Sequence, residues 1–283
     1  MACELPGVYG LPLSRFSGAD LAREAVSRGI VATISGATIW RWLRQDAIRP
    51  WQYRSWIFPR DPAFAFKAGR VLDLYAGLWE DAPLGEGDYV LCADEKTSIQ
   101  ARARIHEDLP PGAARTRRVE HEYKREGALA YLAAWDVHRA KLFGRCEDHS
   151  GIASFDRLVA QIMAEPPYAT ARRVFLVMDN GSSHRGARCI ARLSAQWPAI
   201  IPVHLPVHAS WLDQVEIYFS ILQRKLLTPN NFPDTQTLAQ AILDFQRRYE
   251  ALAKPFEWKF TRRDLRTLLA RVRAHEQDLA DAA

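Results

Sequence analysis

A five-residue run of apolar side chains constrains the fold of this chain more than any other feature. Residues 174–178 read VFLVM, with no polar side chain that could face water on either side. Such a run is typical of a strand buried on both faces, as in a parallel sheet that helices cover. An amphipathic helix is expected before it, because Phe155, Leu158 and Ile162 recur with the spacing of one helical face.

The chain after residue 87 alternates between segments of strand and helix character. The expected strands cover residues 89–93, 128–136, 141–146, 174–178 and 200–205. The expected helices cover residues 155–163, 186–196, 211–227, 235–252 and 262–275. Three strands, a helix, a strand, a helix, a strand and a helix is the element order of an RNase H-like fold. The prediction for residues 88–283 is therefore an α/β domain with a mixed five-stranded sheet flanked by helices.

Positive charge is concentrated near the N-terminus. Residues 11–60 contain eight arginines and three acidic residues, an excess of five that equals the net charge of +5 of the whole chain. This pattern favours a polyanionic partner such as DNA. The four cysteines lack metal-ligand spacing, which favours a reduced cytoplasmic protein. No run approaches the roughly 20 apolar residues of a membrane span, so we expect no membrane partner.

Residues 1–61 are expected to form a small all-α region with two short helices. The first follows the N-cap residue Ser17 and ends near Gly29, and the second begins at Ser35. Basic and hydroxyl side chains on the second helix are typical of a helix-turn-helix, although an ordinary helical pair is the alternative. The candidate DNA contacts on this helix are Thr38, Arg41 and Arg44.

An arginine- and aromatic-rich segment follows these helices. Residues 49–60 (RPWQYRSWIFPR) have a proline near each end, so a regular helix throughout is excluded. Arg49 and Arg54 are candidate DNA contacts in an extended arm, and a linker packed on the neighbouring domain is an equal alternative. Residues 62–87 are expected to form a linker helix and then, at residues 81–87, a domain boundary rich in Gly, Pro and Asp.

Three acidic residues fall at positions that suit a metal site. Asp94 and Asp179 each follow an apolar strand, and strand ends in such sheets meet at the edge where ligands bind. Glu216 lies on a helix beside a buried stripe that includes Val215 and Phe219. Three carboxylates make an all-oxygen site that suits Mg²⁺ or Mn²⁺. A strand-end Asp that only caps the next turn is the alternative for either aspartate alone.

Three motifs carry a resemblance to a known family. Residues 93–100 (ADEKTSIQ), 179–184 (DNGSSH) and 204–216 (HLPVHASWLDQVE) resemble the mariner superfamily of insertion-sequence transposases. The 36 residues between Asp179 and Glu216 fit the spacing of that family's DDE motif. The resemblance extends over nearly the whole chain and includes the segment LPLSRFS near its start.

The resemblance implies an RNase H-like core in which Asp94, Asp179 and Glu216 are the catalytic metal ligands. It implies cut-and-paste transposition at terminal inverted repeats of double-stranded DNA, with insertion at TA. We therefore expect two Mg²⁺ or Mn²⁺ ions, ~4 Å apart, and phosphoryl transfer without a side-chain nucleophile. A homodimer on DNA in the bacterial cytoplasm, associated with the nucleoid, completes the expectation.

Further polar residues lie near the three motifs. Asp213 stands where the family usually has Asn, and it adds a carboxylate three positions before Glu216 on the chain. His184 is a second possible accessory residue, with helix capping as its alternative role. The remaining candidate DNA contacts are Lys96, Arg224 and Lys225.

Two other functions remain open at this stage. Family members usually carry two helix-turn-helix units, and only one fits ahead of residue 62, so the chain is expected to be an N-terminally shortened copy. A truncated or repurposed transposase could act as a non-catalytic DNA-binding repressor, which the intact triad argues against. An RNase H-like nuclease without strand transfer is the second alternative, which the basic N-terminal region argues against.

Overall fold

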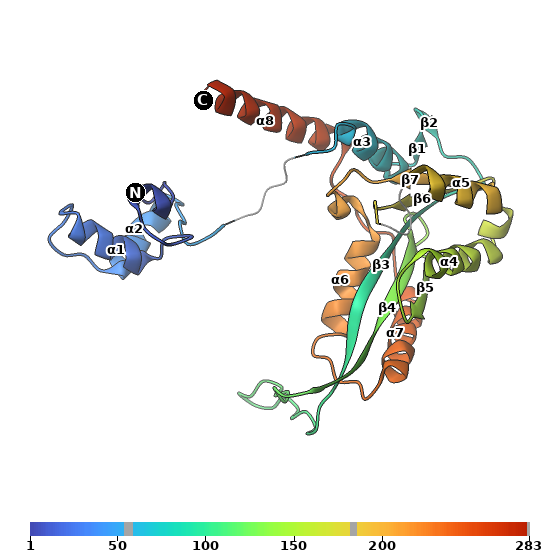
Figure 1. Cartoon of the computed structure of the whole chain (residues 1–283), viewed down its shortest axis with the longest axis horizontal. Helices are drawn as coiled ribbons and strands as arrows, with labels where there is room; N and C mark the ends of the chain where they lie inside the picture. The colour runs from blue at the N-terminus through green and yellow to red at the C-terminus, as the bar shows by residue number, and fades with distance from the viewer. Residues whose placement is uncertain (54–58, 182–185, 282–283) are drawn as a thin grey trace. The chain divides into compact units, whose positions relative to one another are not determined.

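The computed structural model describes residues 1–53, 59–181 and 186–281, and the chain divides into two compact units, Met1–Phe58 and Pro59–Ala283 (Figure 1). The first unit contains the two expected helices, α1 (Gly18–Ser27) and α2 (Gly36–Gln45). The Ser17 hydroxyl accepts a hydrogen bond from the backbone N–H of Asp20, and the Asp20 carboxylate accepts one from the backbone N–H of Ser17. This reciprocal cap fixes the start of α1.

The helices α1 and α2 approach each other closely at their first residues. A Cβ atom on Gly18 would lie 2.8 Å from the carbonyl oxygen of Gly36, so only glycine permits this approach. Helix α2 buries none of its residues, and Trp40 and Trp42 are exposed. The outer face of α2 is therefore open to a partner.

The second unit is built on a mixed five-stranded sheet with the order β5-β4-β3-β6-β7. Its strands are β3 (Asp88–Ala103), β4 (Lys124–Asp136), β5 (Leu142–Glu147), β6 (Arg173–Met178) and β7 (Ile200–His204). The pairs β3–β4 and β4–β5 are antiparallel, whereas β3–β6 and β6–β7 are parallel. The mixed sheet and the α/β class predicted from the sequence are confirmed.

Helices cover both faces of this sheet (Figure 1). One face packs against α4 (Ile152–Ala164) and α5 (Gly186–Gln196), and the other against α6 (Val215–Lys225) and α7 (Thr235–Glu250). Successive residues of a strand point to opposite faces. Cys92 accordingly lies in the core below α6, whereas Leu91 and Ala93 lie in the core below α4.

The helix expected as a linker belongs to the second unit. Helix α3 (Phe64–Tyr75) buries Ala68, Val71 and Leu74 completely, in the same core as Val90 of β3. The compact unit therefore begins near residue 59, and the predicted boundary at residues 81–87 lies inside it. The start of that segment belongs to a short hairpin of β1 (Leu78–Trp79) and β2 (Ala82–Pro83). The helix was expected to continue to residue 79 but ends at Tyr75, because Gly77 adopts a left-handed conformation with a φ of 76°.

The helices α6 and α8 differ modestly from the prediction. The segment expected as one helix over residues 211–227 begins with a 3₁₀ turn, Ser210–Leu212, before α6. Helix α8 (Arg262–Asp281) packs against α3 near its start, where Arg262 forms an ion pair with Asp73.

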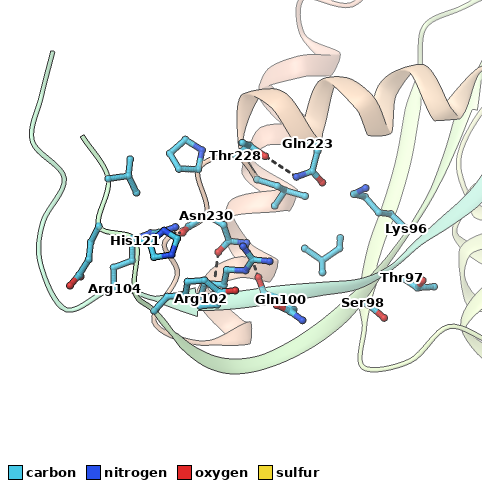
Figure 2. Close-up of a pocket in the computed structure, with 16 residues that line it drawn as sticks. Lys96, Thr97, Ser98, Gln100, Arg102, Arg104, His121, Gln223, Thr228 and Asn230 are labelled. Atoms are coloured by element: carbon cyan, nitrogen blue, oxygen red, sulfur yellow. Dashed lines mark hydrogen bonds between the residues drawn. The ribbon is translucent and has the colours of Figure 1, made fainter. Parts of the chain in front are cut away.

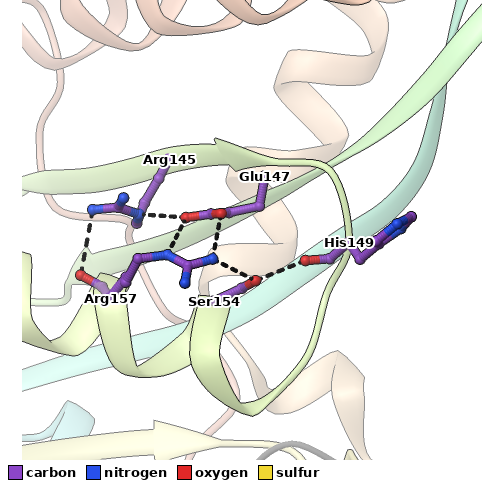
Figure 3. Close-up of polar contacts among 5 residues, drawn as sticks. All are labelled: Arg145, Glu147, His149, Ser154 and Arg157. Carbon is purple, nitrogen blue, oxygen red and sulfur yellow. Dashed lines mark hydrogen bonds and ion pairs between the residues drawn. The ribbon is translucent and has the colours of Figure 1, made fainter.

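A group of polar contacts fastens the edge strand β5 to α4 (Figure 3). The Glu147 carboxylate accepts hydrogen bonds from Arg145 and Arg157, each with an Nε–O distance of 2.9 Å. The Ser154 hydroxyl donates to the backbone carbonyl of His149, 2.8 Å away. The two guanidinium groups lower the pKa of Glu147, so this carboxylate stays charged and the edge of the sheet stays fixed near neutral pH.

Candidate active site

The two predicted strand-end aspartates lie side by side. Strands β3 and β6 are parallel neighbours, and Ala93 pairs with Met178 at the end of their register. Asp179 directly follows β6, as predicted, whereas Asp94 lies inside β3, which continues to Ala103. Both are the next residues after the last β3–β6 pair, so they are neighbours where β6 ends. The Asp179 carboxylate accepts a hydrogen bond from the backbone N–H of Gly181 at 2.7 Å. Asp94 accepts one from the backbone N–H of Glu95, also at 2.7 Å.

Burial and neighbouring charge give Asp94 an unusual protonation equilibrium. Only 9% of this residue is exposed. Burial, together with the negative charges of Asp179, Glu95 and Glu216, raises the pKa of the Asp94 carboxyl to about 7. Like charges gathered in a poorly hydrated place disfavour ionisation unless a cation joins them.

Asp213 and Glu216 come from the start of α6 and complete the acidic cluster. Asp213 is 1% exposed, and its pKa is raised well above its usual value by burial and by the charges of Asp94, Glu216 and Asp179. One of its oxygens accepts a hydrogen bond from the backbone N–H of Val215. Glu216 is exposed, in the first turn of the helix. The four carboxyl groups come from three separate segments, and the negative charges of Asp94, Glu216 and Asp179 oppose ionisation of Asp213.

A tyrosine next to this cluster, Tyr75, was not identified from the sequence patterns. Tyr75, at the end of α3, donates a hydrogen bond of 2.6 Å to the carbonyl oxygen of Leu212, and its hydroxyl lies 3.0 Å from the sulfur of Cys92. Leu212 precedes Asp213 directly, so Tyr75 holds the turn from which α6 and Glu216 begin. No local signal marks a contact between residues 137 positions apart.

Replacing Tyr75 with Phe is expected to lower the free energy of unfolding by about 1–3 kcal/mol, because the buried carbonyl of Leu212 loses its donor. Urea denaturation of purified protein measures this change. Tyr249→Phe is the matched control: no hydrogen bond of its hydroxyl is found in the described part of the chain, so we expect less than about 0.5 kcal/mol. Equal effects of the two substitutions would contradict the assigned role of Tyr75.

The cluster fits a hard divalent cation by its chemistry. In the described ranges, which omit residues 182–185, no three side chains of His, Cys, Asp or Glu are already arranged around one point as a metal site. However, the second carboxylate oxygen of Asp213 is fully buried and has no hydrogen-bond partner among the described residues. An unpaired buried oxygen beside a carboxyl with a pKa raised to about 7 is the expected state of an oxygen-ligand site without its cation.

The other predicted contacts fall in several places. Thr38, Arg41 and Arg44 lie on α2, and Arg49 follows it, all in the first unit. Lys96 lies on β3 two residues beyond Asp94, and Arg224 and Lys225 form the last turn of α6. Arg54 and His184 lie outside the described residues.

Comparison with known proteins agrees with this architecture. The sequence profile of a family described as "DDE superfamily endonuclease" matches residues 89–239. No curated protein sequence matches the chain. The fold is similar to that of the Mos1 mariner paired end complex with Mn (TM-score 0.51, 11% identity, covering 96% of this chain and 77% of that one). It is also similar to the Mos1 transposase paired-end complex with left transposon end (TM-score 0.51, 12% identity, 96% and 76%).

The profile match covers more than half of the chain and includes Asp94, Asp179 and Glu216. The similar structures share its α/β fold at low sequence identity. The chain belongs to the DDE superfamily of endonucleases.

Proposed function

We propose that this protein is a transposase that cuts DNA at the ends of an insertion sequence and joins them to a target. The observation that carries the proposal is the proximity of Asp94, Asp179 and Glu216 beside the end of β6, where the charges of Asp179 and Glu216 act on Asp94. Carboxylates that repel one another favour the binding of a cation, and a bound cation can in turn hold a phosphate group. The same cluster sets the pKa of Asp94 near neutrality, so the group is able to give up its proton when a ligand requires its oxygens.

The three carboxylates would hold two divalent ions, Mg²⁺ or Mn²⁺, which when bound activate an attacking oxygen and stabilise the leaving one. Asp94 would supply its oxygens from within β3, and Asp179 from the residue that follows the paired strand β6. Glu216 supplies its oxygens from the first turn of α6, whose start is fixed by the Tyr75 hydrogen bond. Because burial and neighbouring negative charge raise the pKa of the Asp94 carboxyl, cation binding and loss of its proton would be coupled. The pKa of the buried Asp213 carboxyl is raised in the same direction.

DNA ends are the partner that best fits the rest of the chain. The first unit has a surplus of arginines and an exposed face on α2, where Thr38, Arg41 and Arg44 would read terminal inverted repeats. The similar Mos1 structures are described as a paired end complex and as a strand transfer complex, which supports a dimer that joins two ends. Insertion at TA is part of the same proposal.

No helix in the described ranges is long and apolar enough to cross a membrane. We propose that the protein acts on DNA in the bacterial cytoplasm, associated with the nucleoid when bound.

Incubation of the purified chain with Mg²⁺ and a duplex that carries the element's ends tests this function. We expect cleavage at those ends, its loss on Asp179→Ala, and no cleavage of a duplex with scrambled ends. Binding to the ends without cleavage would favour the repressor instead. Cleavage indifferent to the ends would favour a nuclease without strand transfer. Joining of the cut ends to a target plasmid separates strand transfer from cleavage.

A further inference from the structure

A basic hollow of about 760 Å³ lies on the second unit, beyond the acidic cluster (Figure 2). Its walls come from three segments far apart in the sequence: the outer half of β3, residues 119–123 and the turn after α6. Figure 2 shows Arg102 and Arg104 beside Asn230, with Lys96 nearer the body of the domain. The pattern of apolar and polar residues in the sequence gave no indication of this site.

The three cationic side chains of the hollow form no ion pair with a described carboxylate. In the described part of the chain no carboxylate forms an ion pair with Lys96, Arg102 or Arg104. Glu120, the acid in the wall, already accepts hydrogen bonds from the ring and the backbone N–H of His106. Among the described residues, the hollow is therefore lined by three cationic side chains and one carboxylate, Glu120, which pairs with His106 rather than with any of them.

The guanidinium group of Arg102 also has a donor that forms no hydrogen bond with a described residue. The Arg102 guanidinium lies 4.6 Å from the centre of the Tyr123 ring and the Arg104 guanidinium 5.7 Å from it. The Nε atom of Arg102 and the side-chain oxygen of Gln100 are buried without a partner among the described residues. Stacking on Tyr123 fixes the plane of the Arg102 guanidinium, and planar guanidinium donors suit the oxygens of a phosphate.

The hollow is held in shape by its own hydrogen bonds. Asn230, only 8% exposed, accepts from the backbone N–H of Arg102 and donates to the carbonyl oxygen of Gln100 at 2.7 Å. The backbone carbonyl oxygen of Asn230 accepts a hydrogen bond from Nε of Arg104. The backbone N–H of Phe232 donates a hydrogen bond to the backbone carbonyl oxygen of Arg102. A site that is already ordered loses little entropy when a ligand binds.

The same strand connects the hollow to the acidic cluster. Asp94 and Arg102 are eight positions apart on β3, which is at most about 26 Å at roughly 3.3 Å per residue. A DNA strand that advances about 3.4 Å per step would cover that length in roughly seven to eight base pairs. A duplex cut at the acidic cluster and running along β3 would thus bring a second stretch of its backbone to the hollow.

We propose that this hollow is a phosphodiester-binding site that grips the DNA backbone roughly seven to eight base pairs from the cut. The proposal rests on the proposed function and adds a subsite to it. Arg102 and Arg104 contact phosphate oxygens, and Lys96 contacts the backbone between the hollow and the cut. Such contacts set the register of the duplex rather than its sequence preference.

The test compares the Arg102→Gln, Arg104→Gln double variant with a control of equal charge, the Arg266→Gln, Arg271→Gln double variant on exposed positions of α8. All proteins carry Asp179→Ala and bind an end-bearing duplex without divalent ions, so binding is measured independently of cleavage. We measure the dissociation constant between about 50 and 200 mM salt. Loss of two phosphate contacts lowers the slope of log affinity against log salt by roughly 1 to 2, and the control leaves the slope unchanged.

A second variant and a second measurement keep the result interpretable. Arg102→Lys with Arg104→Lys keeps both charges and is expected to keep most of the slope, which separates lost contacts from misfolding. Ethylation of single phosphates should interfere with binding roughly seven to eight base pairs from the cut, and this interference should vanish in the Gln double variant. An unchanged slope overturns the proposal. If the Gln variant changes only the oligomeric state, the hollow is an interface between copies and the proposal is also wrong.

The two hypotheses fail in different ways. If the protein with an intact Asp179 does not cleave DNA but the Gln variant still loses its salt slope, the proposed function is wrong and the backbone site stands as a DNA contact. If cleavage is observed and the slope does not change, the function stands and the site is wrong.

Discussion

Replacing Asp94 with Asn is expected to lower the rate of metal-dependent DNA cleavage by roughly a thousandfold or more. The substitution keeps the shape of the side chain and removes an anionic oxygen that would bind the metal. Metal-supplied stabilisation of the transition state is worth several kcal/mol, and about 1.4 kcal/mol corresponds to tenfold in rate. Single-turnover cleavage of an end-bearing duplex at saturating Mg²⁺ measures the effect.

Asp244→Asn is the matched control for this experiment, because it makes the same substitution at an exposed aspartate of α7. We expect that variant to cleave at the rate of the unaltered protein. Both variants should bind the duplex with similar affinity without divalent ions. A cleavage rate for Asp94→Asn within tenfold of the unaltered protein would show that the metal-binding carboxylates lie elsewhere.

The second large effect is a dependence of stability on pH and on divalent cations. The pKa of Asp94 is about 7 in the folded protein against 3.8 when unperturbed. The folded state therefore holds a proton that the unfolded state releases, and its stabilising contribution is fully present below pH 4 and is lost as the pH rises to 7. This one carboxyl accounts for at most about 4 kcal/mol at roughly 1.4 kcal/mol per pH unit. Asp213, whose pKa is also raised, acts in the same direction.

Chemical denaturation of the metal-free protein between pH 4 and 7 measures this dependence. We expect the free energy of unfolding to fall across the window and to recover at pH 7 when Mg²⁺ or Mn²⁺ is added, because a ligand that binds only the folded state stabilises it. Carboxylates with lowered pKa, such as Asp88 beside Arg172 and Arg173, lose their contribution below pH 4, outside this window.

Asp94→Asn supplies the control, since it cannot ionise. Its profile between pH 4 and 7 should be flatter than that of the unaltered protein, and its response to Mg²⁺ should be weaker. A flat profile for the unaltered protein, or an equal response of both proteins to Mg²⁺, would contradict the assigned environment of Asp94.

Some of the fold could be predicted because local periodicity reports burial. The apolar run before Asp179 is a strand covered on both faces, and the stripe beside Glu216 lies in the core, with Val215, Phe219 and Leu222 all buried. Where part of a strand extends into solvent, its residues are not buried, and the apolar pattern no longer marks it as a strand. Strand β3 was expected to end at residue 93 and continues to Ala103, because its polar outer half is stabilised by pairing with β4 rather than by burial.

The sequence by itself determined the order of strands and helices along the chain and the choice of Asp94, Asp179 and Glu216 as candidate ligands, because apolar patterns and motifs are local. Only the tertiary structure decided that α3 belongs to the second unit, that Tyr75 supports the start of α6, and that Asp213 shares the charge of the site. It alone also brought Arg102, Tyr123 and Asn230 around one hollow. These are contacts between segments far apart in the chain, and no local pattern encodes which distant surfaces will meet when the core is buried.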